Sequence, residues 1–183
     1  MRRVLSYRPR SVNELPPRGE ARPPVSQDFV WLRNVIPKDS RSVYKMRPVV
    51  NAVVDADSFM EIGARWGRAI ITGLARIKGQ PVVVFASAPY HYGGAWDMQA
   101  AEKFTRMLDL AELFRLPVVN FVDVPGFQIG LAAEKEGAMR YGVRALTAIA
   151  QATVPWCSFI VRKAFGVAAG GHQSDGRFNF RYA

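Results

Sequence analysis

The sequence contains few of the residues on which secreted folds and many enzyme sites depend. It has a single cysteine, Cys157, and two histidines, His91 and His172, among 183 residues. One cysteine can form neither an internal disulfide nor a cysteine-based zinc site. The opening Met1-Arg2-Arg3 leads into polar, proline-rich sequence and not into the apolar core of a signal peptide. These features predict a cytoplasmic, reducing setting.

Long apolar runs are missing as well. Charged or turn residues interrupt every candidate before it reaches the roughly 18 to 20 apolar residues that a membrane helix requires, so we expect no membrane partner. Hydrophobic residues nevertheless make up 49% of the chain, enough for a substantial core. The composition therefore predicts a globular chain.

Several conventional catalytic motifs are absent. The sequence contains no Gly-Lys-Ser/Thr phosphate loop, no Gly-x-Ser-x-Gly elbow and no His-Glu-x-x-His pair, so we expect no metal. Cys157 lies in an apolar run and is predicted to be a small core residue. His91 and His172 adjoin glycine-rich loops, where a turn or surface role is favoured over a site role. Asp123 ends an apolar run, which favours a carboxylate that accepts N–H bonds from a nearby loop.

The positive charge is concentrated near the N-terminus. The chain has a net charge of +10, and residues 1–47 hold 11 Lys and Arg against 4 Asp and Glu. Segment 1–43 is also rich in proline, which predicts an extended arm without its own core, followed by a folded body at 44–183. We expect a solvated or partner-docking arm. Salt-sensitive nucleic-acid binding through this arm is the less favoured alternative.

Strand-like and helix-like patterns alternate after the arm. The 3, 4, 3 spacing of Ala101, Phe104, Leu108 and Ala111 indicates a helix with a buried face, and Asp97 suits its N-cap. The expected elements are a helix or strand at Val49–Val54, a strand at Ser58–Ile62, a hairpin of Ala69–Ile77 and Pro81–Ala86, a helix from Asp97 to Phe114, a strand at Val118–Val124, a helix from Ala133 to Ala152 and a strand at Trp156–Lys163.

The order of these elements predicts an α/β fold. Strands joined by helices lie parallel with right-handed crossovers, which brings the loops after the strands to one edge of the sheet. Those loops are rich in small residues and hold Gly93–Ala95, Gly126–Gly130 and Gly166–Ala168. Backbone N–H groups collected there can stabilise negative charge, so we expect the site at this edge.

Four ordered motifs, Tyr44–Pro48, Phe121–Phe127, Ala152–Pro155 and Val161–Gly166, carry a family resemblance. Through them, residues 44–172 resemble the carboxyltransferase β subunits of biotin-dependent acyl-CoA carboxylases, the propionyl-CoA type especially. The similarity is to their C-terminal half, which implies a crotonase/ClpP-like spiral of repeated ββα units. The ending reads as mid-domain sequence, so we expect this domain to be truncated.

The resemblance implies that the chain is the carboxybiotin-binding half of a carboxyltransferase. In such enzymes CO2 moves from carboxybiotin to the α-carbon of a short acyl-CoA, here propionyl-CoA first, with oxyanions held by backbone N–H groups. Biotin is the implied cofactor. The implied partners are biotin carboxylase and biotin carrier subunits, acyl-CoA and an N-terminal-type carboxyltransferase domain within an oligomer. An acyl-CoA decarboxylase subunit and a non-catalytic assembly module remain the alternatives.

The resemblance also implies roles for particular residues. The family's Arg-Lys-Ala-Tyr-Gly-Gly-Ala motif corresponds to Arg162–Ala168, so the N–H groups of Val167 and Ala168 are the implied oxyanion donors. Val167 stands where the family has its second glycine, and a β-branched residue restricts the backbone there. The implied biotin contacts are Gly126, Phe127 and Gly166, and the substrate-side loop is Gly93, Gly94 and Ala95.

Overall fold

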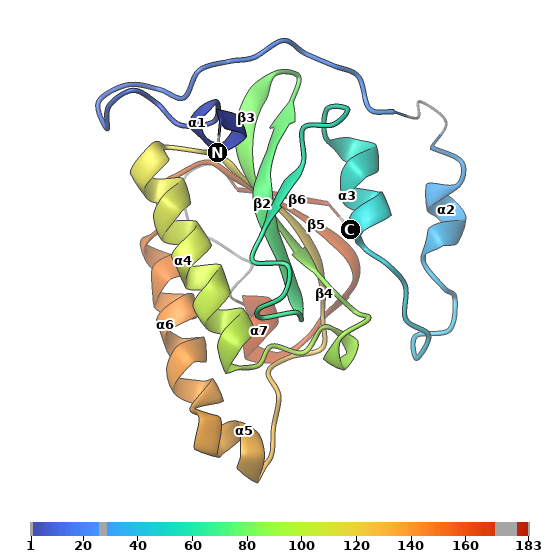
Figure 1. The fold of residues 1–183 in the computed structure, drawn as a ribbon. Helices are drawn as coiled ribbons and strands as arrows, with labels where there is room; N and C mark the ends of the chain where they lie inside the picture. The colour runs from blue at the N-terminus through green and yellow to red at the C-terminus, as the bar shows by residue number, and fades with distance from the viewer. Residues whose placement is uncertain (1, 26–28, 171–178, 183) are drawn as a thin grey trace.

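One mixed β-sheet organises the chain. The computed structural model describes residues 2–25, 29–170 and 179–182. Within these residues six strands pair in the order of the sequence, and α4 and α6 cover one face of the sheet while the shorter α3 lies on the other (Figure 1). The strands are β1 (Met60–Ile62), β2 (Ile70–Ile77), β3 (Gln80–Ser87), β4 (Val118–Val124), β5 (Trp156–Ala164) and β6 (Asn179–Tyr182).

The predicted hairpin is confirmed as β2 and β3, which pair antiparallel. Its two turn residues, Lys78 and Gly79, have φ angles of 49° and 78°, as a two-residue turn of the type favoured in hairpins requires. The buried Asp55 carboxylate accepts both of their N–H groups, at 2.8 and 2.7 Å. An aspartate 23 residues upstream of Lys78 thus holds the turn.

The predicted long helix is confirmed as α4 (Met98–Phe114). Asp97 caps it by accepting the N–H of Ala100 at 2.7 Å. The four residues of the predicted apolar face are all fully or almost fully buried. On this face Phe104 stacks on Phe85 of β3, with ring centroids 4.1 Å apart.

The single helix predicted from Ala133 to Ala152 is wrong. The structure has two helices there, α5 (Leu131–Glu136) and α6 (Ala138–Gln151), because Gly137 adopts a φ of 83° and ends α5. The buried face of α6 is made of mostly small residues, Ala138, Gly142, Ala145 and Ile149. A Cβ at Gly142 would lie 2.8 Å from the Phe127 ring, so a glycine lets α6 approach the loop after β4.

Two short elements differ from the prediction. Residues 47–53 form α3 (Arg47–Val53), which settles the choice between helix and strand. The strand predicted from Ser58 starts at Met60, because Ser58 belongs to a turn and bonds to the backbone of Asp55 and Arg76.

The predicted parallel direction of the strands joined by helices is also found, since β3, β4, β5 and β6 run parallel. Successive residues of β3 point to opposite sides: Val83 and Phe85 join the core under α4 and α6, whereas Val82 and Val84 join the core under α3. Residues 82–85 of β3 are therefore buried on both faces of the sheet, as is typical of strands in parallel sheets. The carboxyl ends of the parallel strands share one edge of the sheet, called the carboxyl edge below.

The N-terminal arm lies along the body, crossing near the β2–β3 turn (Figure 1). It contains two short helices that were not predicted, α1 (Arg2–Leu5) and α2 (Leu32–Val35). Arg76 of β2 donates to the carbonyls of Ser6 at 2.7 Å and Pro17 at 3.0 Å, and the Tyr7 side chain is buried. No helix in the described part of the chain has the length and apolarity to span a membrane.

Candidate active site at the carboxyl edge

The loops that follow β3, β4 and β5 converge, as predicted. Trp96 donates its N–H to Gly126 at 3.0 Å, and Gln128 donates to the Trp96 carbonyl at 2.8 Å. On the other side, Phe165 donates its N–H to Val124 at 3.0 Å. The loop after β4 is therefore hydrogen-bonded to both of its neighbours.

Glycine allows these backbones to meet closely. Gly94 has a φ of 87°, and a Cβ placed there would lie 2.5 Å from the carbonyl oxygen of Asp123. Gly126 and Gly166 also have positive φ angles, of 133° and 66°. A Cβ on Gly166 would lie 3.9 Å from the Gly126 Cα, so the two loops face each other with no side chain between these positions.

The predicted donors lie next to this contact. The stretch predicted as a small-residue loop forms the short helix α7 (Gly166–Gly170), and Gly171 lies outside the described residues. Val167 and Ala168 belong to its first turn, where N–H groups have no carbonyl of an earlier turn to bind. The Ala168 side chain is fully buried, whereas that of Val167 is 67% exposed.

Phe127 performs a packing role. Its ring contacts Trp96 edge-on, with centroids 5.9 Å apart, and covers Gly142 of α6. The loop after β4 is therefore packed against the core through Phe127. A biotin contact by Phe127 stays a prediction.

The prediction that Asp123 accepts a loop N–H is only partly right, because the backbone donor, Lys163, belongs to β5 and not to a loop. Its carboxylate, fully buried, accepts the Lys163 N–H at 3.0 Å. It also pairs with Arg162 at 3.1 Å and accepts the Tyr44 hydroxyl at 2.9 Å. Burial and the negative charge of Asp123 raise the pKa of the Tyr44 phenol, so Tyr44 remains a hydrogen-bond donor. Sequence reasoning missed this cluster, because Tyr44 and Asp123 are 79 positions apart.

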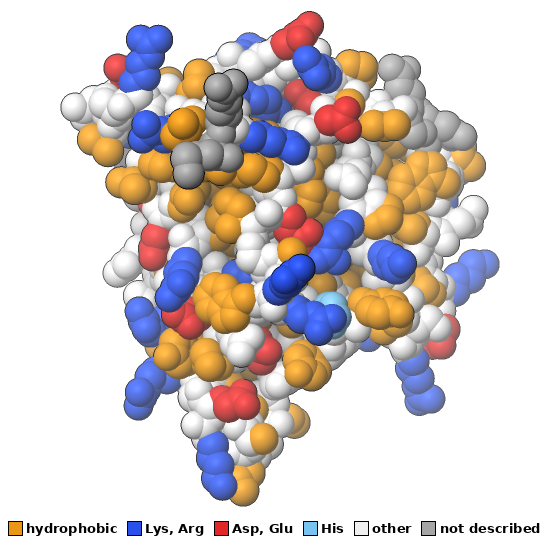
Figure 2. All heavy atoms as spheres, viewed as in Figure 1, with side chains coloured by type: hydrophobic (Ala, Val, Ile, Leu, Met, Phe, Trp, Pro, Cys, Tyr) orange, Lys and Arg blue, Asp and Glu red, His pale blue; other side chains and the backbone are white. Residues whose placement is uncertain are grey.

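His91 lies beside the substrate-side loop. The backbone N–H of His91 donates to the Ala88 carbonyl. Burial together with the positive charges of Arg68 and Arg47 lowers the pKa of its imidazole. Figure 2 shows the histidine among blue Lys and Arg side chains on this face. Since the imidazole makes no hydrogen bond to Gly93, Gly94 or Ala95 in the described structure, the turn or surface role is the better description. His172 lies outside the described residues.

Cys157 is half-buried and not fully in the core, so its predicted position is only partly right. It pairs in register with Val119, on the face of the sheet that the short α3 covers incompletely. Burial raises the pKa of its thiol, which disfavours a nucleophilic thiolate. Across the described residues, no cluster of three or more His, Cys, Asp or Glu side chains is arranged to hold a metal ion.

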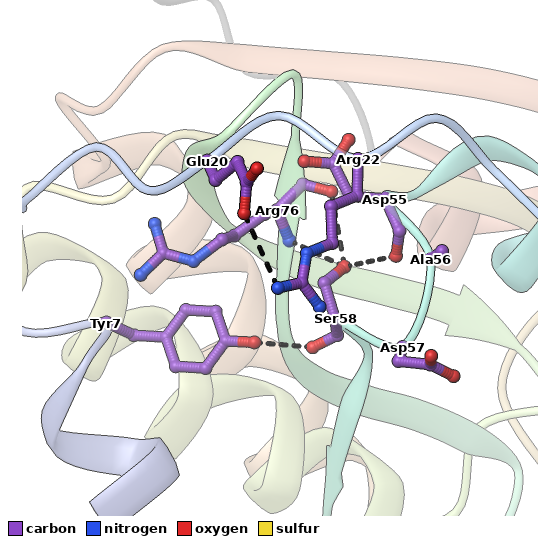
Figure 3. A pocket seen from close by; sticks show the side chains of 8 residues that line it. All are labelled: Tyr7, Glu20, Arg22, Asp55, Ala56, Asp57, Ser58 and Arg76. Atoms are coloured by element: carbon purple, nitrogen blue, oxygen red, sulfur yellow. Dashed lines mark hydrogen bonds and ion pairs between the residues drawn. The ribbon is translucent and has the colours of Figure 1, made fainter.

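A polar cavity of about 200 Å³ lies at the opposite edge of the sheet, between the arm and the hairpin. Figure 3 shows the hydroxyl of Tyr7 directed at Ser58 and the Arg22 guanidinium next to Glu20. Arg76 and Asp55 hold backbone groups of the arm and the turn. Because these charged groups serve the docking of the arm, we assign the functional site to the carboxyl edge. The lining residues are Tyr7, Glu20, Arg22, Asp55, Ala56, Asp57, Ser58 and Arg76.

Comparison with known proteins agrees with this geometry. Residues 1–180 match the family model of the carboxyl transferase domain. The chain is 39% identical over 166 residues to an uncharacterized carboxylase, YngE, of Bacillus subtilis, covering 91% of this chain and 32% of the relative. It is 35% identical over 168 residues to the carboxyltransferase subunit of propionyl-CoA carboxylase of Haloferax mediterranei, covering 92% and 33%.

Among solved structures, the transcarboxylase 12S hexamer with methylmalonyl-coenzyme A bound superposes with a TM-score of 0.88 at 29% identity. The match covers 97% of this chain and 35% of that one. It confirms the predicted α/β, crotonase-like class. The chain spans about a third of the length of the curated relatives it matches. Since the family model covers nearly all of its residues and its sheet carries the same fold, the chain belongs to the carboxyl transferase domain family of the biotin-dependent acyl-CoA carboxylases.

Proposed function

We propose that this chain is the carboxybiotin-binding half of an acyl-CoA carboxyltransferase and that propionyl-CoA is the acceptor. The observation that carries the proposal is the cradle between Gly126 and Gly166, where a Cβ on either residue would come within 4.0 Å of the opposite loop. A flat bicyclic ring can lie against this surface because neither residue has a side chain that covers its backbone. The N–H groups of Val167 and Ala168 lie in the turn that begins there.

The residue types around the cradle suit a reaction that depends on backbone donors. Neither residues 124–130 nor residues 164–170 include an acid, a base, a cysteine or a histidine. Carboxybiotin would supply the CO2 unit, the biotin left behind would take the α proton of the acyl-CoA, and the α-carbon would then form its new bond to CO2. In this proposal Val167 and Ala168 donate their N–H groups to the ureido oxygen, on which negative charge grows as CO2 leaves. Fixed donors aimed at developing charge are an effective form of catalysis.

The proposal requires a second protein surface over the carboxyl edge. Apolar side chains on the loop after β4 and on the two helices that follow it are exposed, with Ile129 at 92%, Leu131 at 71% and Met139 at 60%. Exposed apolar side chains on one segment of the chain support a protein contact. We propose that the acyl-CoA-binding, N-terminal-type domain covers them within an oligomer, and that biotin carboxylase and a biotin carrier supply the carboxyl group. Residues 1–43 act as the linker before the body at 44–183.

Propionyl-CoA is the proposed acceptor because one relative is named a propionyl-CoA carboxylase and the superposed transcarboxylase carries methylmalonyl-coenzyme A. Methylmalonyl-coenzyme A is propionyl-coenzyme A with a carboxyl group added at its α-carbon, so both names are consistent with a propionyl acceptor. The acyl-CoA half would choose among chain lengths, since the same spiral hosts several chemistries.

The test is carboxyl transfer from carboxybiotin to propionyl-CoA by this chain with the acyl-CoA-binding half supplied. The same chain, labelled with 15N, is titrated with free biotin while the amide signals of Gly126, Gly166 and Ala168 are followed. We expect turnover and selective shifts of these signals. An assembly module would associate with the other half but give neither result, and a decarboxylase would release CO2 without forming a carboxylated acyl-CoA.

A further inference from the structure

Asp123 is the residue at which the three loops of the carboxyl edge are joined. Its N–H donates to the Ser87 hydroxyl at 2.9 Å, which reaches the end of β3. Its carbonyl oxygen packs against Gly94, where a Cβ would come within 2.5 Å. Its carboxylate accepts the Lys163 N–H at 3.0 Å, which reaches the end of β5. One residue therefore contacts β3, the loop after β3 and β5, while it is itself part of β4.

The pairing of β4 with β5 is irregular at this position. Val122 pairs with Ile160, but Val124 pairs with Ala164, so one residue of β4 faces three of β5. Such a bulge bends the strand and redirects the chain that follows. Arg162 and Lys163 belong to the bulge, and Asp123 binds both of them. The chain then enters the turn that holds Gly166, Val167 and Ala168.

The negative charge of the Asp123 carboxylate is paired with the positive charge of the Arg162 guanidinium. Arg162 approaches the carboxylate through Nε at 3.1 Å and through Nη2 at 3.1 Å, and its side chain is only 12% exposed. It also donates to the Ser42 carbonyl at 2.8 Å and lies 5.0 Å from the centre of the Tyr44 ring. Charge-assisted hydrogen bonds in a buried site are strong and directional, and removing one partner leaves the other charge uncompensated.

We infer that Asp123 and Arg162 are positioning residues, whose ion pair holds the β5 bulge and so sets where the backbones of Gly126 and of Gly166–Ala168 face each other. Tyr44 supports the pair from the start of the folded body. Neither charged side chain belongs to the donor pair or to the cradle. The consequence for carboxyl transfer rests on the proposed function, whereas the placement of the loops does not.

The test compares two buried aspartates at opposite edges of the sheet. Asp123→Asn keeps the shape of the side chain and removes its charge. Asp55→Asn is the matched control, because Asp55 is 5% exposed and also holds backbone N–H groups, those of Lys78 and Gly79. Amide hydrogen exchange and 15N chemical shifts are measured on the full 183-residue chain.

In Asp123→Asn we expect the amide signals of Gly166–Ala168 to move. The Phe165 N–H, which is bonded to the Val124 carbonyl, should exchange at least about tenfold more relative to the wild-type chain than the N–H groups of the hairpin turn. Asp55→Asn should show the reverse pattern. Equal increases at both edges, or unchanged Gly166–Ala168 signals, would overturn the inference.

Should Asp123→Asn fail to fold, Tyr44→Phe provides a milder change, because it removes one hydroxyl and keeps the ion pair. We expect smaller shifts at the same Gly166–Ala168 amides, and shifts confined to the neighbours of residue 44 would refute the role. In the complete carboxyltransferase, Asp123→Asn should lower kcat and leave the KM for acyl-CoA unchanged. The amide measurement needs no biotin, so selective loop shifts without biotin binding would reject the proposed function and keep this inference.

Discussion

A proline at position 167 tests the proposed donor pair most directly. Proline has no N–H, so Val167→Pro removes one donor that no other side-chain change can remove. The first turn of a helix tolerates proline, and Val167 lies in the first turn of α7 with its side chain 67% exposed. Little packing is therefore lost. Losing one donor of this kind lowers kcat about 100- to 1,000-fold, equivalent to roughly 3 to 4 kcal/mol of transition-state stabilisation.

The control is Val167→Ala, which keeps the N–H and removes only exposed methyl groups. A surface change of this size is worth about 0.5 kcal/mol at most, or about twofold in rate. Both variants are assayed for carboxyl transfer to propionyl-CoA with the acyl-CoA-binding half supplied, and circular dichroism melts check that both fold. If the two folded variants have the same kcat, the Val167 N–H is not a donor and the reasoning is refuted.

Three further predictions concern stability, each measured by chemical or thermal unfolding. Burial lowers the pKa of Lys103 from 10.5 to about 8, so between pH 8 and 10.5 the unfolded chain binds more protons than the folded chain. The free energy of unfolding should therefore rise with pH in this range, by about 3 kcal/mol in all. Lys103→Met should flatten this rise. Gly94→Ala should lower the free energy of unfolding by about 2 kcal/mol or more, because the new Cβ meets the Asp123 carbonyl. Gly93→Ala, at φ 62° with open space around it, should lower it by about 1 kcal/mol. Equal losses would contradict the close approach at Gly94. Asp97→Ala should cost about 1 kcal/mol by removing the cap of α4, and no loss would contradict the capping role.

The elements that the sequence predicted well are those specified by neighbouring residues. The hairpin follows from a Gly-containing turn between two β-prone runs, and α4 follows from the spacing of its apolar face and its Asp97 cap. The break between α5 and α6 is also local in origin. Gly137 follows a turn that contains Lys135, a common helix end, and the helix predicted from Ala133 overlooks this signal.

By itself, the sequence determined the α/β class, the order of the strands, the edge at which the loops meet and the family motifs, because turn chemistry and hydrophobic period act over a few residues. Only the tertiary structure decided what holds that edge together. Asp123 binds Tyr44, which lies 79 residues before it in the sequence, and Arg162, which lies 39 residues after it. Arg76 binds the arm at Ser6, 70 residues before it. Such contacts depend on strand register, on a bulge and on burial, which exist only once the chain has folded and which no local pattern encodes.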